Sequence, residues 1–364
     1  MSAPGPVDVF LNDRVKAGDF PGAVWLVAED GRVLGEGAVG DAAREPQRRP
    51  ASTGTLYDLA SLTKPLATAL LAVRMHATGR WDLENRLEAY LPDWRPQDAR
   101  AGVTLLDLLT HRSGLPGWDP LYLHAADVRG RILRIATMPD AHPPLLQTEY
   151  SCLNYILLGF ALERSGGAPL DQLFEAHIRA PLGGPEILYK PGRALRERIA
   201  PTEMGNGHER HLAGASGDGY NAWRRELIWG EVHDNNAHTL DGVAGNAGLF
   251  GTARAVFAVA SAFLSGGPGL LDEAERALFG HNFTPGLSQG RTVGFQRAGS
   301  APSSAGAALP DAAFGHTGFT GTSLWIDPGS RRINILLTNR VHPKYRDLDM
   351  NKVRRDFHVL AADL

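Results

Sequence analysis

Two residues with complementary chemistry lie three positions apart in this chain. Ser61 and Lys64 form the only Ser-x-x-Lys sequence among its 364 residues. In a helix, positions i and i+3 lie on one face, so the two side chains would be neighbours. A serine hydroxyl is a weak nucleophile until a nearby base takes its proton, and a lysine amine held this close can do so. The pair therefore predicts a nucleophilic serine, and the plainer alternative is a serine that only caps a helix.

The sequence after Ser61 favours a helix that begins at this point. Pro65 is tolerated in a first turn, where its missing N–H would have no helical partner. An apolar run of helical length follows at 66–75, and Gly79 provides a stop. Ser61 would then lie near the positive end of a helix dipole, which favours negative charge that develops there during a reaction.

Two further segments contain residues that could assist the serine. Tyr150 opens an apolar helix, and a phenol can relay protons when a nearby cation, here Lys64, lowers its pKa. The segment 314–321 is rich in small residues and precedes a strand, so its backbone N–H groups could face a developing oxyanion. The structural alternatives are a buried aromatic side chain and a glycine-rich turn.

Charge, cysteine content and hydrophobicity limit the possible binding partners and cellular compartment of the protein. The formal net charge is −3, and no basic run of five residues occurs, so a nucleic-acid partner is not expected. One cysteine excludes an intrachain disulfide, and no apolar stretch reaches membrane-spanning length. The N-terminus lacks the basic and apolar regions of a signal peptide, so we expect a cytoplasmic protein, or a periplasmic or extracellular one if a leader was removed. No sequence pattern indicates an oligomeric state.

Strand and helix signals are distributed unevenly along the chain. A hairpin is predicted over 23–40 around the dipeptide Asp30-Gly31, and a second over 321–338 around a turn at 327–330. Between them, helices and long loops dominate. Because strands occur near both ends, we expect an α+β fold with one antiparallel sheet built from both termini and flanked by helices.

This pattern predicts two lobes. Residues 1–79 and 252–364 would form a discontinuous α/β sheet lobe, and residues 80–251 would form an inserted helical lobe. The helix that begins at Ser61 would lie where the lobes meet, which is a common place for an active-site cleft.

Three short motifs occur in the order found in a known family. They are Ser-Leu-Thr-Lys at 61–64, Tyr-Ser-Cys at 150–152 and His-Thr-Gly at 316–318. With these motifs the chain resembles the serine β-lactamase and penicillin-binding protein superfamily, and most of all its class C β-lactamase-like branch, which includes DD-peptidases and esterases. Supporting stretches at 108–116, 154–159 and 242–250 extend the resemblance to nearly the whole chain. The resemblance implies a β-lactamase/transpeptidase-like fold and a serine hydrolase.

The resemblance also implies roles for individual residues. Ser61 would be the nucleophile that forms an acyl intermediate, Lys64 its base, and Tyr150 a second proton relay toward the leaving group. His316 takes the third-motif position, which is lysine in many relatives and histidine in others. The backbone N–H groups of Ser61 and Phe319 would form the oxyanion hole. No cofactor or metal is implied.

Substrate contacts are implied for Cys152, Thr317 and Gly318, and here the chain departs from the family pattern. Cys152 replaces an asparagine that usually contacts the lysine and the substrate amide, and a thiol is a weaker hydrogen-bonding group. His316 removes a permanent positive charge near the carboxylate that β-lactams and D-Ala-D-Ala peptides carry. Both departures disfavour efficient β-lactam hydrolysis, and the substrate is left open among esters, amides, β-lactams and D-amino-acid peptides.

Two other readings compete with a serine hydrolase. The histidine-rich sequences at 208–211 and 233–238 could suggest a metal site, but they lack His-Glu-x-x-His spacing and a carboxylate cluster. The remaining alternative is a catalytically inactive binding protein on a β-lactamase-like scaffold, since a fold alone does not determine function.

Overall fold

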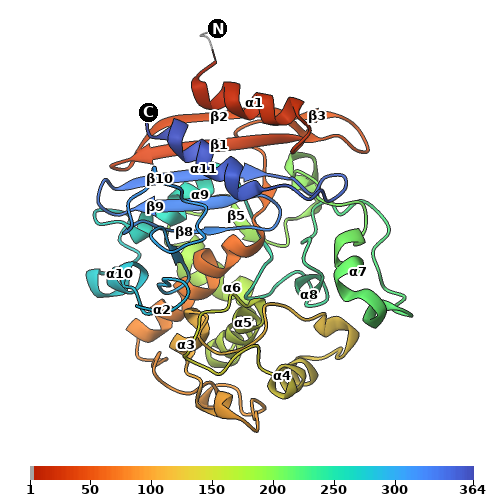
Figure 1. Cartoon of the computed structure of the whole chain (residues 1–364), viewed down its shortest axis with the longest axis vertical. Helices are drawn as coiled ribbons and strands as arrows, with labels where there is room; N and C mark the ends of the chain where they lie inside the picture. The colour runs from red at the N-terminus through yellow and green to blue at the C-terminus, as the bar shows by residue number, and fades with distance from the viewer. Residues whose placement is uncertain (1–3) are drawn as a thin grey trace.

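The computed structural model describes residues 4–364 and contains an antiparallel seven-stranded sheet with helices on both faces (Figure 1). The strand order is β3-β2-β1-β10-β9-β8-β7, so strands from opposite ends of the chain meet at the centre. The strands are β1 (Gly22–Glu29), β2 (Arg32–Ala43), β3 (Arg49–Pro50), β7 (Gln296–Arg297), β8 (Phe314–Thr317), β9 (Ser323–Asp327) and β10 (Arg332–Thr338). The predicted α+β fold, with one sheet built from both termini, is confirmed.

Strand β1, which lies inside the sheet between β2 and β10, is buried on both of its faces. Side chains alternate along a strand, so Trp25 and Val27 point to one face while Val24 and Leu26 point to the other. On the first face lie the two terminal helices, α1 (Pro6–Lys16) and α11 (Met350–Ala361), whose apolar side chains share a core with Trp25. The second face packs on α9 (Ala253–Ala260) and the main core.

Both predicted hairpins form. Asp30 and Gly31 connect β1 to β2 with φ angles of 50° and 76°, the left-handed geometry whose twist matches that of paired strands. The second hairpin joins β9 to β10, with Ile326 opposite Ile333. Because β10 also pairs with β1, this hairpin links the C-terminal strands to the N-terminal ones.

The segment that carries Ser61 is helical, but it is not the regular α-helix expected from its first residue. A 3₁₀ turn covers Ala60–Leu62, a wider π-helical turn covers Lys64–Ala69, and only then does α2 (Leu70–Ala77) begin. The whole stretch 62–73 is buried in the main core. Pro65 lies at the start of the π-helical turn, where its missing N–H would have no helical partner.

The part between residues 80 and 251 is mainly helices and loops, and it also contains two strands of a small second sheet. That sheet has the order β4-β6-β5, with β4 (Tyr57–Asp58), β5 (Ile187–Tyr189) and β6 (Leu249–Gly251). The expected division into two lobes at 79/80 and 251/252 stays a prediction. Within residues 4–364, no helix combines the length and apolar character needed to cross a membrane.

The remaining helical elements lie between residues 87 and 280. The α-helices are α3 (Leu105–Leu109), α4 (Val128–Thr137), α5 (Cys152–Gly166), α6 (Leu170–Phe174), α7 (Gly207–Ala213), α8 (Asn235–His238) and α10 (Glu273–Gly280). Six 3₁₀ turns and a second π-helical turn connect them: Leu87–Ala89, Ala99–Gly102, Leu121–Leu123, Arg193–Arg198, Gly214–Gly217, Ser261–Phe263 and Glu175–Arg179. The capping box of Thr104 and Asp107, which satisfies two N-terminal N–H groups of α3, positions that helix against α5.

Candidate active site

The hydroxyl of Ser61 lies between two groups that can exchange protons with it. Lys64 Nζ is 2.9 Å from Ser61 Oγ, and the Tyr150 hydroxyl is 2.8 Å from the same oxygen. The lysine comes from the next helical turn, and the tyrosine from the residues just before α5, 89 positions later. Both distances are within hydrogen-bonding range, so Ser61 can pass its proton directly to a base.

A sharp backbone turn presents Ser61 to the cavity. Ala60 has a φ angle of 48°, a left-handed conformation that costs energy for a residue with a side chain. Two hydrogen bonds hold it there. The Ala60 N–H donates to Asp58 Oδ1 at 2.8 Å, and Thr322 Oγ1 donates to the carbonyl of Leu59 at 3.0 Å. The surrounding structure therefore fixes the nucleophile in an unusual geometry.

Lys64 has the surroundings of a neutral amine. Its side chain is fully buried, and burial lowers its pKa, although Cys152 and Asp234 partly oppose this shift. Within residues 4–364 no carboxylate forms an ion pair with it; its other neighbours are the Asn246 carbonyl at 3.0 Å and Cys152 Sγ at 3.5 Å. An amine that loses its proton more easily is a better general base for Ser61.

Tyr150 differs electrostatically from the sequence-based expectation. We predicted that Lys64 would lower the pKa of the phenol, but burial, followed by Cys152, raises this pKa well above its ordinary value. The hydrogen bond with Ser61 and the positive charge of Arg291 only partly oppose the rise. Tyr150 is therefore protonated in the free enzyme, which suits a proton donor rather than the first base.

The third motif lies on β8, and His316 is uncharged there. Its side chain is buried, and burial, with Lys64 and Arg291, holds its pKa well below the ordinary value. Nδ1 is 2.8 Å from the Thr317 carbonyl, so the proton is assigned to Nδ1 and Nε2 is left as an acceptor. This neutral imidazole agrees with the expectation that position 316 carries no permanent charge.

The backbone at Gly318 and Phe319 leaves one N–H group without a hydrogen-bond partner. Gly318 N–H donates to the Thr322 carbonyl at 2.8 Å, and the Phe319 carbonyl accepts from Arg340 Nε at 2.8 Å. Among the described residues, the Phe319 N–H has no hydrogen-bond partner. A Cβ at position 318 would lie 2.1 Å from Thr322 Oγ1 and 2.6 Å from the Leu59 carbonyl, so only glycine allows this close approach.

These groups surround one cavity of about 400 Å³. Ser61, Tyr150, His316, Thr317, Gly318 and Phe319 line it, while Lys64 and Cys152 lie beneath the serine. The structure thus brings together all eight residues named from the sequence.

Sequence reasoning missed three arginines that also line the cavity: Arg291, Arg340 and Arg354. Both terminal nitrogens of Arg354 are hydrogen-bonded, since its Nη2 donates to the carbonyls of Gly318 and Thr322 and its Nη1 donates to Asn351 Oδ1. None of the three forms an ion pair with a carboxylate of residues 4–364, and Arg291 differs because its single side-chain hydrogen bond among these residues runs from Nη2 to Gln289. The sequence could have indicated that Arg291 has no acidic neighbour along the chain, since residues 276–310 contain no Asp or Glu.

Comparison with known proteins places this geometry in context. The family model described as Beta-lactamase matches residues 7–357. The chain is 32% identical to a Bacillus subtilis (strain 168) protein named N-acetylmuramyl-L-alanine amidase, over 95% of this chain and 82% of the relative. It is 31% identical to an Escherichia coli (strain K12) protein named putative D-alanyl-D-alanine carboxypeptidase, over 95% and 84%. A solved class C beta-lactamase superposes with a TM-score of 0.73 at 18% identity, over 97% and 94%, which confirms the predicted fold.

Proposed function

This chain belongs to the beta-lactamase family and is a serine hydrolase, and we propose that Ser61 is its nucleophile, Lys64 its base and Tyr150 its second proton carrier. One observation carries the proposal: the Lys64 amine and the Tyr150 hydroxyl both lie within 2.9 Å of Ser61 Oγ. The lowered pKa of Lys64 and the raised pKa of Tyr150 assign them different tasks.

The proposed reaction has two halves. Ser61 Oγ attacks the substrate carbonyl while its proton moves to Lys64, and the N–H groups of Ser61 and Phe319 bind the oxyanion. As the tetrahedral intermediate collapses, Tyr150 donates its proton to the leaving group and recovers one from Lys64. A water molecule then attacks the acyl ester by the same route, with the same groups in reverse roles, and releases Ser61.

Arg291 supports a substrate that carries a carboxylate. It is 4% exposed, and burial lowers its pKa to about 10, so it stays charged at neutral pH. Its Nη2 donates to Gln289, but its Nε is buried without a partner among the described residues. An unpaired buried cation is costly, and an anion bound in the cavity would offset that cost. Arg291 thus provides the positive charge that His316 lacks.

We therefore propose a D-amino-acid peptide with a free C-terminal carboxylate as the substrate class. The Escherichia coli relative named as a D-alanyl-D-alanine carboxypeptidase would act on such a substrate, and an amidase, as the Bacillus subtilis relative is named, need not. The unpaired guanidinium of Arg291 favours the first kind of substrate.

The nucleophile is tested by intact-protein mass spectrometry and by Ser61→Ala. An ester or peptide substrate should leave an acyl adduct on the wild type that maps to Ser61, and Ser61→Ala should abolish turnover of p-nitrophenyl acetate. Retention of most of the turnover in this variant would refute the assignment. Thr320→Ser, which keeps a hydroxyl outside the reacting groups, is the matched control.

The substrate class is tested with a pair of peptides that end in D-Ala-D-Ala, one with a free carboxylate and one with a carboxamide. The wild type should prefer the carboxylate, and Arg291→Gln should remove that preference by raising KM about 10- to 100-fold for the carboxylate alone. Turnover of the uncharged ester should change less than about threefold. Equal hydrolysis of both peptides by the wild type would favour an amidase.

A further inference from the structure

The ring of Phe319 is held by groups that take no part in the proposed chemistry. Its centroid lies 4.9 Å from the ring of His208, 5.5 Å from that of His233 and 5.5 Å from that of Tyr345, and the Arg340 guanidinium lies 5.1 Å from it. The two histidines are nearly parallel to it, with interplanar angles of 29° and 22°. These packing partners hold the ring of residue 319, while Arg340 Nε also holds its backbone carbonyl at 2.8 Å.

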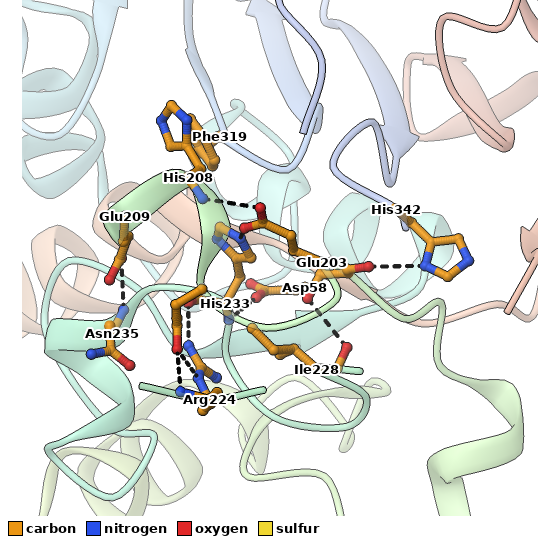
Figure 2. Close-up of polar contacts among 12 residues, drawn as sticks. Asp58, Glu203, His208, Glu209, Arg224, Ile228, His233, Asn235, Phe319 and His342 are labelled. Atoms are coloured by element: carbon orange, nitrogen blue, oxygen red, sulfur yellow. Dashed lines mark hydrogen bonds and ion pairs between the residues drawn. The ribbon is translucent and has the colours of Figure 1, made fainter. Parts of the chain in front are cut away.

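A buried carboxylate joins the two histidines. Glu203 is 2% exposed; one of its oxygens is 3.0 Å from His233 Nε2, and the other accepts the His208 backbone N–H at 3.0 Å (Figure 2). Glu203 lies in an extended segment that exchanges backbone hydrogen bonds with Ile228. The carboxylate thus connects the two histidines whose rings stack on Phe319.

Both polar groups of the His233 backbone, the N–H and the carbonyl, are hydrogen-bonded. Its N–H donates to Asp58 Oδ2 at 2.7 Å, and its carbonyl accepts from Arg224 Nη2 at 2.6 Å (Figure 2). The other oxygen of Asp58 holds the Ala60 N–H, and its carbonyl accepts from Thr320 Oγ1 at 2.8 Å. One aspartate therefore ties together the segment before Ser61, His233 and the residue after Phe319.

Burying the Glu203 carboxylate and its polar partners does not by itself make the fold more stable. Removing a carboxylate from water costs several kcal/mol, and an apolar cluster of the same volume is often at least as stable. Directed hydrogen bonds specify a geometry that apolar contacts alone do not. Here the specified geometry is that of Phe319 relative to Ser61.

We propose that the Glu203–His233 pair positions the oxyanion hole, by orienting the Phe319 ring so that its backbone N–H faces the carbonyl that Ser61 attacks. This inference rests on the proposed function, in which Phe319 is an oxyanion donor. Neither Glu203 nor His233 contacts Ser61, Lys64 or Tyr150, so both are positioning residues and not catalytic ones.

The test compares His233→Ala and Glu203→Leu with the wild type in hydrolysis of p-nitrophenyl acetate and in inhibition by phenylboronic acid. The boronate forms a tetrahedral adduct with the nucleophile, and one of its oxygens occupies the oxyanion position. Loss of an oxyanion donor costs about 10²–10³ in rate, so a misoriented donor should lower kcat about 10- to 100-fold, with KM changed less than about threefold. The inhibition constant should rise by the same factor as kcat falls.

A double-mutant cycle decides whether the effect acts through Phe319. Phe319→Leu keeps the backbone N–H but loses the ring stack, and it should cost little further rate in the His233→Ala background. Glu203→Leu, which removes the pair without leaving a buried carboxylate unpaired, replaces His233→Ala in the cycle if that variant does not fold. His238→Ala is the matched control, because His238 pairs with Glu231 at 3.7 Å away from Phe319, and it should behave as the wild type.

Two results would overturn the positioning role: folded His233→Ala or Glu203→Leu with wild-type kcat and boronate affinity, or additive effects of either substitution with Phe319→Leu. Failure of the proposed function would look different, because the wild type itself would then show no ester hydrolysis or no adduct at Ser61.

Discussion

The thiol of Cys152 lies 3.5 Å from the Lys64 amine and 4.0 Å from the Tyr150 hydroxyl. A family asparagine usually occupies this position, whereas the thiol is a weak donor and acceptor. The half-buried cysteine therefore fills the position beside the base without offering a strong hydrogen bond to a substrate amide.

We predict that Cys152→Asn improves peptide hydrolysis more than ester hydrolysis. A side-chain amide can accept from Lys64 and donate to a peptide carbonyl, and one such hydrogen bond is worth about 0.5–1.5 kcal/mol. The ratio of kcat/KM for the D-Ala-D-Ala peptide to that for p-nitrophenyl acetate should rise about three- to tenfold. Cys152→Ala should leave this ratio unchanged, and an unchanged ratio in Cys152→Asn would show that the thiol position does not face the substrate.

The pH dependence of acylation should report the Lys64 amine. Burial lowers its pKa below the ordinary 10.5, and the neutral form is the base, so kcat/KM should rise with pH through an apparent pKa below 10.5. Lys64→Arg should lose activity at every pH, because a guanidinium stays protonated. A pH–rate profile on p-nitrophenyl acetate measures this, and an activity limb at or above 10.5 would contradict it.

Gly318→Ala should damage both the site and the fold. The new Cβ would lie 2.1 Å from Thr322 Oγ1 and 2.6 Å from the Leu59 carbonyl, so β8 would have to move away from the Ser61 turn. Overpacking of this kind typically costs about 1–3 kcal/mol, and we expect at least a tenfold loss of kcat. Urea unfolding and ester hydrolysis measure the two effects. Gly102→Ala, at a position with open space, should change neither.

Glu209→Gln should stabilise the protein more at pH 8 than at pH 5. Burial, followed by Asp234, raises the pKa of Glu209 from 4.5 to about 7. A carboxyl with a raised pKa contributes its stability below about pH 4.5 and loses it as pH rises through about 7. The glutamine does not titrate, and its oxygen can still accept the Asn235 N–H, which donates to Glu209 at 2.8 Å. The expected gain at pH 8 is on the order of 3 kcal/mol.

Thermal unfolding of wild type and Glu209→Gln at both pH values checks this prediction. Glu203→Gln is the comparison for a second buried glutamate, one whose partners include a histidine ring. A stability difference that is the same at pH 5 and pH 8 would show that Glu209 has no raised pKa.

Local sequence signals determined a large part of this protein's secondary structure and of its candidate active site. The dipeptide Asp30-Gly31 and the apolar alternation around it specify a hairpin, because turn chemistry and strand periodicity are local properties. The spacing of Ser61 and Lys64 likewise specifies their proximity, because one helical turn separates them. The resemblance through three short motifs then assigned Tyr150 and the 316–318 segment to the same site, and the structure brings them there.

Only the tertiary structure decided the electrostatics of the site. Whether a nearby cation or burial dominates the pKa of Tyr150 depends on how much water the fold excludes, and spacing in the sequence does not reveal this. The unpaired charge of Arg291 and the stack of Phe319 on His233 also arise from segments far apart in the sequence. Such contacts follow from the packing of the whole chain, because the energies of burial and pairing belong to neighbours in space and not to neighbours in sequence.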